Sequence, residues 1–218
     1  MATALLQTTY FGPVQWYQKL CRYDHCLIEQ HDSFHKQTYR NRCIIATANG
    51  LQALTVPVEH SSHPSPLTSH PLKDLRISDH NQWRRVHWNA LQSAYSESPF
   101  FDYYADDLRP FFEQKYEFLL DFNEAIREII CQLIDIHPHV ERTTGYKVQG
   151  SGFMVQGSGF NDECVDFREV INAKHPLPDP DFQPKPYWQV FQHKHGFLSN
   201  LSILDLLFCM GPEAVFYL

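Results

Sequence analysis

The dipeptide Asn49-Gly50 stands between two apolar runs and limits what this chain can fold into more than any other short feature. Asn-Gly between apolar segments is the strongest short-range signal for a β-hairpin with a two-residue turn. We therefore predict strands over residues 40–48 and 51–58, with Ala48 opposite Leu51. The result would be an antiparallel ribbon that packs one of its faces on a core.

Side chains alternate along a strand, so the predicted hairpin has two distinct faces. The face toward the core carries Asn41, Cys43, Ile45, Leu54, Val56 and Val58. The opposite face carries the charged and polar side chains of the run that leads into the hairpin, Lys36, Thr38, Arg40 and Arg42. This second face is the best candidate for a binding surface.

Arg40 and Arg42 are the strongest candidates for anion binding. Residues two apart on a strand have Cα atoms about 6.6 Å apart, so both guanidinium groups can converge on one diphosphate or carboxylate. Lys36 would add a point charge and Thr38 a hydroxyl. The alternative is structural: Arg40 pairs with Glu59 across the hairpin, and Arg42 is a solvated surface charge.

A β-α-β unit is predicted to open the fold. Residues 5–11 and 25–30 have the pattern of strands, and Pro13 suits the first turn of a helix over 14–23 that connects them. Free N–H groups at such a helix start bind anions, so we expect Gln15, together with Asn41, to orient a substrate through its amide. The alternative is a plain strand-to-helix turn.

Helices are predicted for the middle third of the chain. One is expected over 78–95 and another over 121–134, followed by a short C-terminal helix over 203–209. The side chains that the first of these should bury are Trp83, Val86, Ala90, Leu91 and Ala94. The whole pattern predicts a single α/β domain over residues 1–218, with a mixed sheet opened by the β-α-β unit and the hairpin.

Two segments interrupt this pattern. Residues 59–72 are rich in Ser, His and Pro and predict a surface excursion, either a lid or decoration. Residues 147–160 contain the six-residue sequence VQGSGF twice, which predicts a duplicated Gly-rich loop. No G-K-[ST] follows it, so a phosphate-binding loop is not indicated.

Charge and cysteine content exclude several classes of protein. With 25 acidic residues against 18 Lys and Arg, the net charge is −7, and the chain lacks the basic footprint of a general nucleic-acid binder. The six cysteines contain no C-x-x-C pair and several lie in apolar runs, which predicts reduced thiols and a cytoplasmic location. No signal peptide or membrane span is predicted.

Candidates for acid–base chemistry are few. Glu29 and His35 lie close in sequence to the two arginines, and His87 could approach from the helical part of the chain. His31 and His35 are spaced like metal ligands on a helix, but they precede a strand, so we predict no metal site and no cofactor. Cys43 should face the core and no G-x-S-x-G element is present, so no nucleophilic triad is predicted.

Several motifs occur together in a fixed order along nearly the whole chain. They are Tyr10-Phe11-Gly12-Pro13-Val14-Gln15-Trp16-Tyr17, Lys36-Gln37-Thr38-Tyr39-Arg40-Asn41-Arg42 with Asn49-Gly50, Leu54-Thr55-Val56-Pro57-Val58, His87-Trp88 with Ser93-Ala94-Tyr95 and Ser98-Pro99-Phe100-Phe101, Asp166-Phe167-Arg168, and Leu201-Ser202-Ile203-Leu204-Asp205-Leu206-Leu207-Phe208. In this order the chain resembles the WbqC-like protein family, bacterial proteins often associated with surface-polysaccharide (O-antigen) gene clusters. The resemblance implies a role in O-antigen production, with glycine or aminoacyl transfer proposed for a member.

Two functions are therefore expected, and whether the chain is an enzyme stays open. The first is a transferase of surface-polysaccharide biosynthesis that moves an aminoacyl group such as glycine to a nucleotide-linked amino sugar. Its ligand would be an anionic small molecule, either a sugar nucleotide or an activated acyl donor. The alternative is a non-catalytic binding or assembly protein of the polysaccharide pathway, with a pathway protein as its partner.

Overall fold

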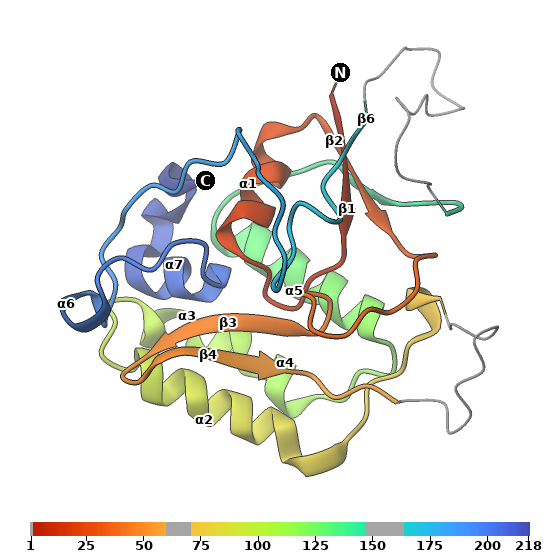
Figure 1. Cartoon of the computed structure of the whole chain (residues 1–218). Coiled ribbons are helices and arrows are strands. Elements are labelled where there is room, and N and C mark those ends of the chain that lie inside the picture. The colour runs from red at the N-terminus through yellow and green to blue at the C-terminus, as the bar shows by residue number, and fades with distance from the viewer. Residues whose placement is uncertain (1, 60–70, 147–163) are drawn as a thin grey trace.

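The computed structural model describes residues 2–59, 71–146 and 164–218 (Figure 1). The duplicated segment at 147–160, and the excursion at 59–72 apart from its two ends, lie outside the described residues. Parallel strands and the first helix occupy one part of the molecule, and the hairpin and the second helix occupy another (Figure 1). The α/β class predicted from the sequence is confirmed.

The predicted β-α-β unit opens the fold. Strand β1 (Thr3–Gln7) is followed by helix α1 (Val14–Arg22) and strand β2 (His25–Glu29), and β1 pairs with β2 in parallel. Two short strands, β5 (Val140–Arg142) and β6 (Cys164–Asp166), complete a parallel sheet in the order β5-β2-β1-β6. Both central strands are almost entirely buried, as parallel strands usually are.

The hairpin is confirmed, but its register differs from the prediction. Strands β3 (Arg42–Thr47) and β4 (Gly50–Thr55) form an antiparallel ribbon that is separate from the parallel sheet. Thr47 pairs with Gly50, so the turn is centred one residue earlier than expected, and Cys43 lies opposite Leu54. Gly50 has a φ of 104°, which glycine adopts without strain. A shift of two residues keeps the same side chains on each face, so Cys43 and Ile45 are still buried.

Helices follow in the middle third of the chain. They are α2 (Trp83–Tyr95), α3 (Phe101–Leu108), α4 (Pro110–Glu113) and α5 (Leu119–Leu133), with the short 3₁₀ helices η1 (Leu72–Asp74) and η2 (His80–Gln82) before them. The buried face of α2 runs through Trp83, His87 and Leu91, whereas Val86 is exposed. The prediction that Val86 is buried was wrong. The inner face of α2 follows a spacing of four residues from Trp83, and Val86 lies outside that row.

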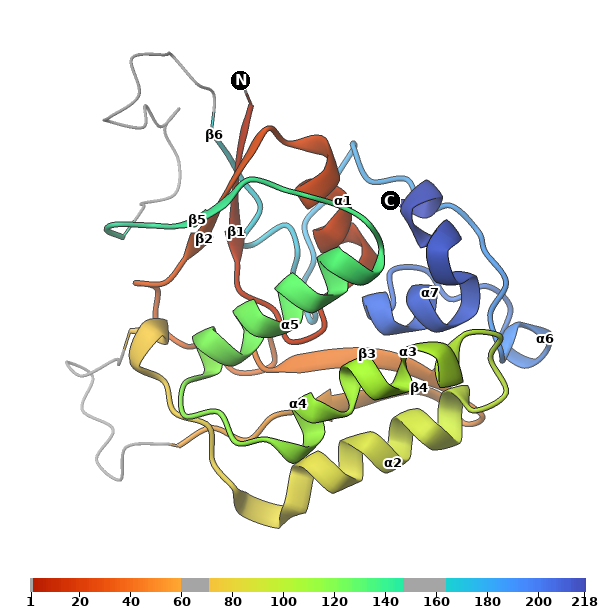
Figure 2. The same cartoon turned by 180° about the vertical axis from the view of Figure 1, so that it is seen from behind.

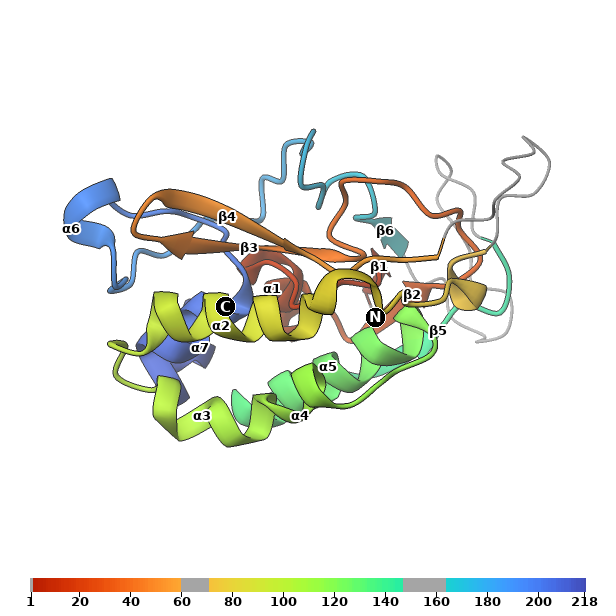
Figure 3. The ribbon, with the colours of Figure 1, turned by 90° about the horizontal axis from the view of Figure 1, so that it is seen from below.

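Helices cover one side of the hairpin. Seen from below, α2 lies next to the β3-β4 ribbon, and α3, α4 and α5 lie beyond it (Figure 3). From behind, α5 crosses the molecule between the parallel strands and the hairpin (Figure 2). Asn123 of α5 donates a hydrogen bond of 2.8 Å to the backbone oxygen of Arg40, which ties the segment before β3 to this helix. The segment that leads into β3 is therefore anchored to α5.

The C-terminal part closes the core. Two short helices, α6 (Gln192–His195) and α7 (Ile203–Met210), are followed by the 3₁₀ helix η3 (Gly211–Tyr217). Ser202 caps α7, because its side chain accepts a hydrogen bond from the backbone N–H of Leu204. Among the described helices, none is long and apolar enough to cross a membrane.

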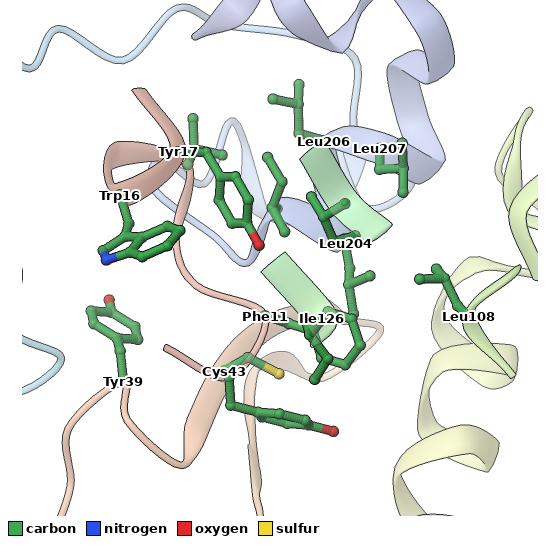
Figure 4. Close-up of a cluster of buried hydrophobic side chains, with 14 of the residues drawn as sticks. Phe11, Trp16, Tyr17, Tyr39, Cys43, Leu108, Ile126, Leu204, Leu206 and Leu207 are labelled. Atoms are coloured by element: carbon green, nitrogen blue, oxygen red, sulfur yellow. The ribbon is translucent and has the colours of Figure 1, made fainter. Parts of the chain in front are cut away.

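Aromatic and aliphatic side chains from distant parts of the chain meet in the core (Figure 4). Tyr39, which precedes β3, points toward Trp16 of α1, and Leu204 of α7 reaches the same region. Cys43 is buried there, and burial raises the pKa of its thiol to about 12. Cys43 therefore faces the core, as predicted, and is not activated as a nucleophile.

Candidate functional site

The segment between β2 and β3 does not continue as a strand and instead forms a series of turns. Gln37 has a φ of 62°, which breaks the alternation of side chains before β3 begins at Arg42. Thr38 and Arg40 are buried, whereas Lys36 is exposed and Arg42 is half-buried. The prediction that these four side chains share one outward face was therefore wrong. Arg40 belongs to one site and Lys36 and Arg42 to another, whereas the hydroxyl of Thr38 donates to the backbone oxygen of His35 at 2.9 Å.

The first site is a group of charged side chains at the carboxyl ends of the parallel strands. We call it the strand-end cluster, and it consists of Glu29, Asp32, Arg40, Thr143, Asp166 and Arg168. Glu29, the last residue of β2, accepts hydrogen bonds from the backbone N–H of His31 at 2.8 Å and from the hydroxyl of Thr143 at 2.9 Å. Its second carboxylate oxygen lies 3.5 Å from a guanidinium nitrogen of Arg168.

Two arginines of the strand-end cluster are held by carboxylates. Arg168 Nη2 lies 2.7 Å from Asp166 Oδ2, and Arg40, only 2% exposed, forms an ion pair with Asp32. Burial lowers the pKa of Arg40, and the neighbouring Asp32 carboxylate opposes that effect. The cluster lies where ligands usually bind in parallel α/β sheets, but these charges already interact with one another.

The second site is a cavity at the open end of the hairpin, away from its turn. We call it the hairpin pocket; its volume is about 800 Å³. Its described lining residues are Phe34, Lys36, Gln37, Asn41, Arg42, Thr55, Val56, Pro57, Val58, Glu59, Ser78, His80 and Asn81. The volume lies within the range of small-molecule sites, which is roughly 300–1,000 Å³. Three predicted substrate-binding residues, Lys36, Asn41 and Arg42, therefore line one cavity.

Polar side chains of the hairpin pocket have defined positions. Arg42 Nε donates to the hydroxyl of Thr55 at 3.2 Å, so the guanidinium is oriented along the pocket wall. Asn41 donates to the backbone oxygen of Val56 at 2.7 Å, so its amide joins the two sides of the hairpin base. Asn41 thus supports the wall, as its predicted position toward the core implies. Arg42 is thus the charged lining residue whose side chain is held by a hydrogen bond to the hairpin, through Thr55.

Backbone strain is concentrated beside this pocket. Gln37 and Asn81, which line it, both have a φ of 62°, and Gln82 follows with a φ of 49°. Residues with side chains rarely adopt such values, and each costs on the order of 1–3 kcal/mol, typically at functional sites. The strain supports a binding role for the hairpin pocket.

The ionisable lining residues that sequence reasoning missed are Glu59 and His80. His80 Nδ1 lies 3.1 Å from Ser78 Oγ, so the hydroxyl and the imidazole form a hydrogen-bonded pair in the wall of the pocket. No local pattern in the sequence predicts the 3₁₀ helix His80–Gln82, which brings His80 close to Ser78.

The predicted catalytic residues do not line the described part of this pocket. Glu29 belongs to the strand-end cluster, and the side chain of His35 is 61% exposed and lies 4.0 Å from Asp32. His87 is buried under the hairpin, where its Nδ1 lies 2.9 Å from the hydroxyl of Tyr10. Burial lowers the pKa of His87 to about 4, so its imidazole is neutral near pH 7.

Gln15 lies apart from both sites. Its backbone N–H donates to Asn200 Oδ1 at 3.0 Å, and its side-chain amide donates to Asp179 at 2.8 Å. The backbone N–H of Val14 donates to Leu201 at 3.0 Å. Two N–H groups at the start of α1 are therefore already used by the C-terminal part of the chain, which favours the plain strand-to-helix turn over an anion site.

Comparison with known proteins places this chain in a family. The model of the WbqC-like protein family matches residues 7–177, a range that contains both sites. The chain belongs to the WbqC-like protein family. The uncharacterized protein Rv1507c of Mycobacterium tuberculosis is 26% identical to it over 227 residues, which cover 99% of this chain and 96% of that protein. No solved structure matches it.

Membership confirms the resemblance found in the sequence. The mycobacterial relative is described only as uncharacterized, and this WbqC-like protein has two candidate sites of its own. Of these, the strand-end cluster is a set of internal ion pairs, and the hairpin pocket is a cavity whose described lining carries two cationic side chains, Lys36 and Arg42, and one carboxylate, Glu59.

Proposed function

We propose that this WbqC-like protein is a transferase of surface-polysaccharide biosynthesis that binds an anionic small molecule in the hairpin pocket. The observation that carries the proposal is that Lys36 and Arg42 line the same cavity of about 800 Å³. The ligand would be a sugar nucleotide or an activated acyl donor. Family membership supports the pathway, because the resemblance implies a role in O-antigen production.

Arg42 is the main anion-binding residue in this proposal. A guanidinium presents a planar set of donors that matches phosphate or carboxylate oxygens, and Thr55 already limits its orientation. Lys36 adds a second, exposed positive charge from the segment between β2 and β3. Arg40 holds the segment between β2 and β3 in place through Asp32, and it acts on the ligand only through the position of Arg42.

Aminoacyl transfer to an amino sugar needs a base. The amine nitrogen attacks the acyl carbonyl, a C–N bond forms, the bond to the leaving group breaks, and the amine gives up a proton. Among the described lining residues, Glu59 and His80 can accept that proton, and Ser78 fixes the ring of His80. Glu29 and His35, the acid–base candidates predicted from the sequence, would require a ligand that extends beyond this cavity.

Calorimetric titration tests the proposal with a UDP-linked amino sugar, UDP and inorganic diphosphate as probes. We expect saturable binding of at least one probe, and Arg42→Ala should weaken it about 10- to 100-fold, the value of a hydrogen bond between charged groups. Arg109→Ala is the matched control, since Arg109 is exposed, pairs with Glu113 and does not line the pocket. Absence of binding, or equal loss in both variants, would contradict an anion site at Arg42.

The second candidate function is a non-catalytic binding or assembly protein of the polysaccharide pathway. It is favoured by the strand-end cluster, where Arg40 and Arg168 brace the fold through internal ion pairs. In that case no probe should bind, and Arg42→Ala should instead reduce co-purification of a pathway protein. The two functions therefore predict opposite results in the same titration.

A further inference from the structure

A group of three potential metal ligands lies at the opposite end of the parallel sheet, where strands β2 and β5 begin. These strands pair in parallel, with Cys26 beside Val140 and Leu27 beside Glu141. The same register places His25 beside His139, and the backbone N–H of Cys26 donates to the oxygen of His139 at 2.8 Å. Because side chains alternate along a strand, His25, His139 and Glu141 leave the same face of the sheet. Figure 2 shows β5 beside β2 at this edge.

The distances within this group suit a metal ion. His25 Nε2 lies 3.5 Å from one oxygen of Glu141, and His139 Nε2 lies 3.4 Å from the other. All three ligand atoms lie within 4.8 Å of one another. In a tetrahedral zinc site with bonds of about 2.0–2.1 Å, ligand atoms are about 3.3 Å apart. Each imidazole therefore already lies at about that distance from the Glu141 carboxylate, one on each of its two oxygens.

Ion pairs among His25, His139 and Glu141 explain this arrangement less well than a bound metal ion does. The centroids of the His25 and His139 rings are 4.6 Å apart, so protonating both to pair with one carboxylate would place two positive charges side by side. His25 Nε2 is buried and has no hydrogen-bond partner in the described structure, although Glu141 is nearby. A divalent cation would satisfy two neutral imidazoles and the carboxylate at once.

We propose that His25, His139 and Glu141 bind a divalent ion of the zinc class. Two imidazole nitrogens and one carboxylate oxygen select zinc-like ions over Mg²⁺ and Ca²⁺, which require mainly oxygen ligands. His139 and Glu141 are exposed, so water can complete the coordination. The ion would hold the short edge strand β5 against β2. The site is separate from the hairpin pocket, and it does not depend on the proposed function.

The test is titration of the full-length, tag-free protein with Zn²⁺ after treatment with a chelator. A Cys21→Ser background removes the exposed thiol, which could bind zinc by itself. We expect one Zn²⁺ per chain and a rise in melting temperature, and no response to Mg²⁺. His139→Ala and Glu141→Gln should each weaken binding by more than about tenfold, since even changes around metal ligands cost about that much.

His137→Ala is the matched control, because His137 is exposed two residues from His139 and faces Asp135 instead. It should bind Zn²⁺ like the parent. Co²⁺ should give the visible absorption of a low-coordinate site, which His25→Ala abolishes while circular dichroism confirms a folded chain. Absence of saturable Zn²⁺ binding would overturn the proposal in favour of ion pairs only. Equal binding by the parent, His139→Ala and Glu141→Gln would overturn it as well.

Discussion

Arg40 and Arg42 lie two residues apart and belong to different environments. Arg40 is 2% exposed and forms an ion pair with Asp32 in the strand-end cluster, whereas Arg42 is half-buried on the wall of the hairpin pocket and contacts Thr55. A buried charge with an internal partner stabilises a conformation. A charge beside a cavity can exchange water for a ligand. Two arginines in one short run can therefore have different roles: Arg40 stabilises the fold, and Arg42 is available to bind a ligand.

Arg40→Ala should have the largest effect on stability. Removing one partner of a buried ion pair leaves the other charge uncompensated, which costs about 3–5 kcal/mol. Because Asp32 retains some exposure, we expect about 3 kcal/mol in chemical denaturation. The double variant Arg40→Ala with Asp32→Asn should recover part of the loss. A loss below about 1 kcal/mol would show that Arg40 is not a structural brace and would weaken the comparison with Arg42.

His87→Gln tests whether His87, which lies under the hairpin, is part of the buried core. The pKa of His87 is about 4 in the folded state and about 6.5 when exposed, so between these pH values the unfolded chain binds a proton that the folded chain does not. Stability therefore falls as the pH is lowered from 6.5 to 4, by roughly 3 kcal/mol from this group. His87→Gln should remove this part of the pH dependence in denaturation measurements. An unchanged pH profile would mean that His87 is accessible to solvent.

Arg42→Lys separates charge from shape at the hairpin pocket. Lysine keeps the charge and loses the guanidinium fork, so we expect probe binding to weaken by about 1 kcal/mol, or roughly fivefold. The free energy of unfolding should change by less than about 0.5 kcal/mol, as at most surface positions. Calorimetry and denaturation of the same sample measure both quantities. A larger effect on stability than on binding would make Arg42 resemble Arg40.

Lys36→Ala should have the smallest effect. Lys36 is exposed, so its charge is screened and contributes less than about 0.5 kcal/mol to probe binding, which is about a twofold change. The effect should disappear at high salt, whereas the effect of Arg42→Ala should persist in part. Lys174→Ala, at another exposed lysine, is the control and should bind the probe like the parent.

Local patterns predicted much of the fold because they depend on neighbours in the chain. Asn49-Gly50 predicted the hairpin, Pro13 predicted the start of α1, and the spacing of two strands predicted the parallel unit. The error in the hairpin register did not change its faces, because alternation has a period of two. The family was also evident from the motifs and their order.

The candidate sites were only partly predictable. Lys36, Asn41 and Arg42 line the hairpin pocket, but Arg40 turned inward because the backbone at Gln37 leaves the strand conformation. A left-handed residue other than glycine has no clear local signal, since the rest of the structure must hold it in place.

The sequence by itself determined the α/β class, the β-α-β opening, the hairpin and the family, because each depends on short-range propensity or ordered motifs. Only the tertiary structure decided which arginine is paired and which lines a cavity, since an ion pair such as Arg40 with Asp32 depends on burial and on the path of a loop. It alone also brought His80 onto the pocket wall and set His25 beside His139. Register between distant strands is a long-range property, and no single stretch of chain contains it.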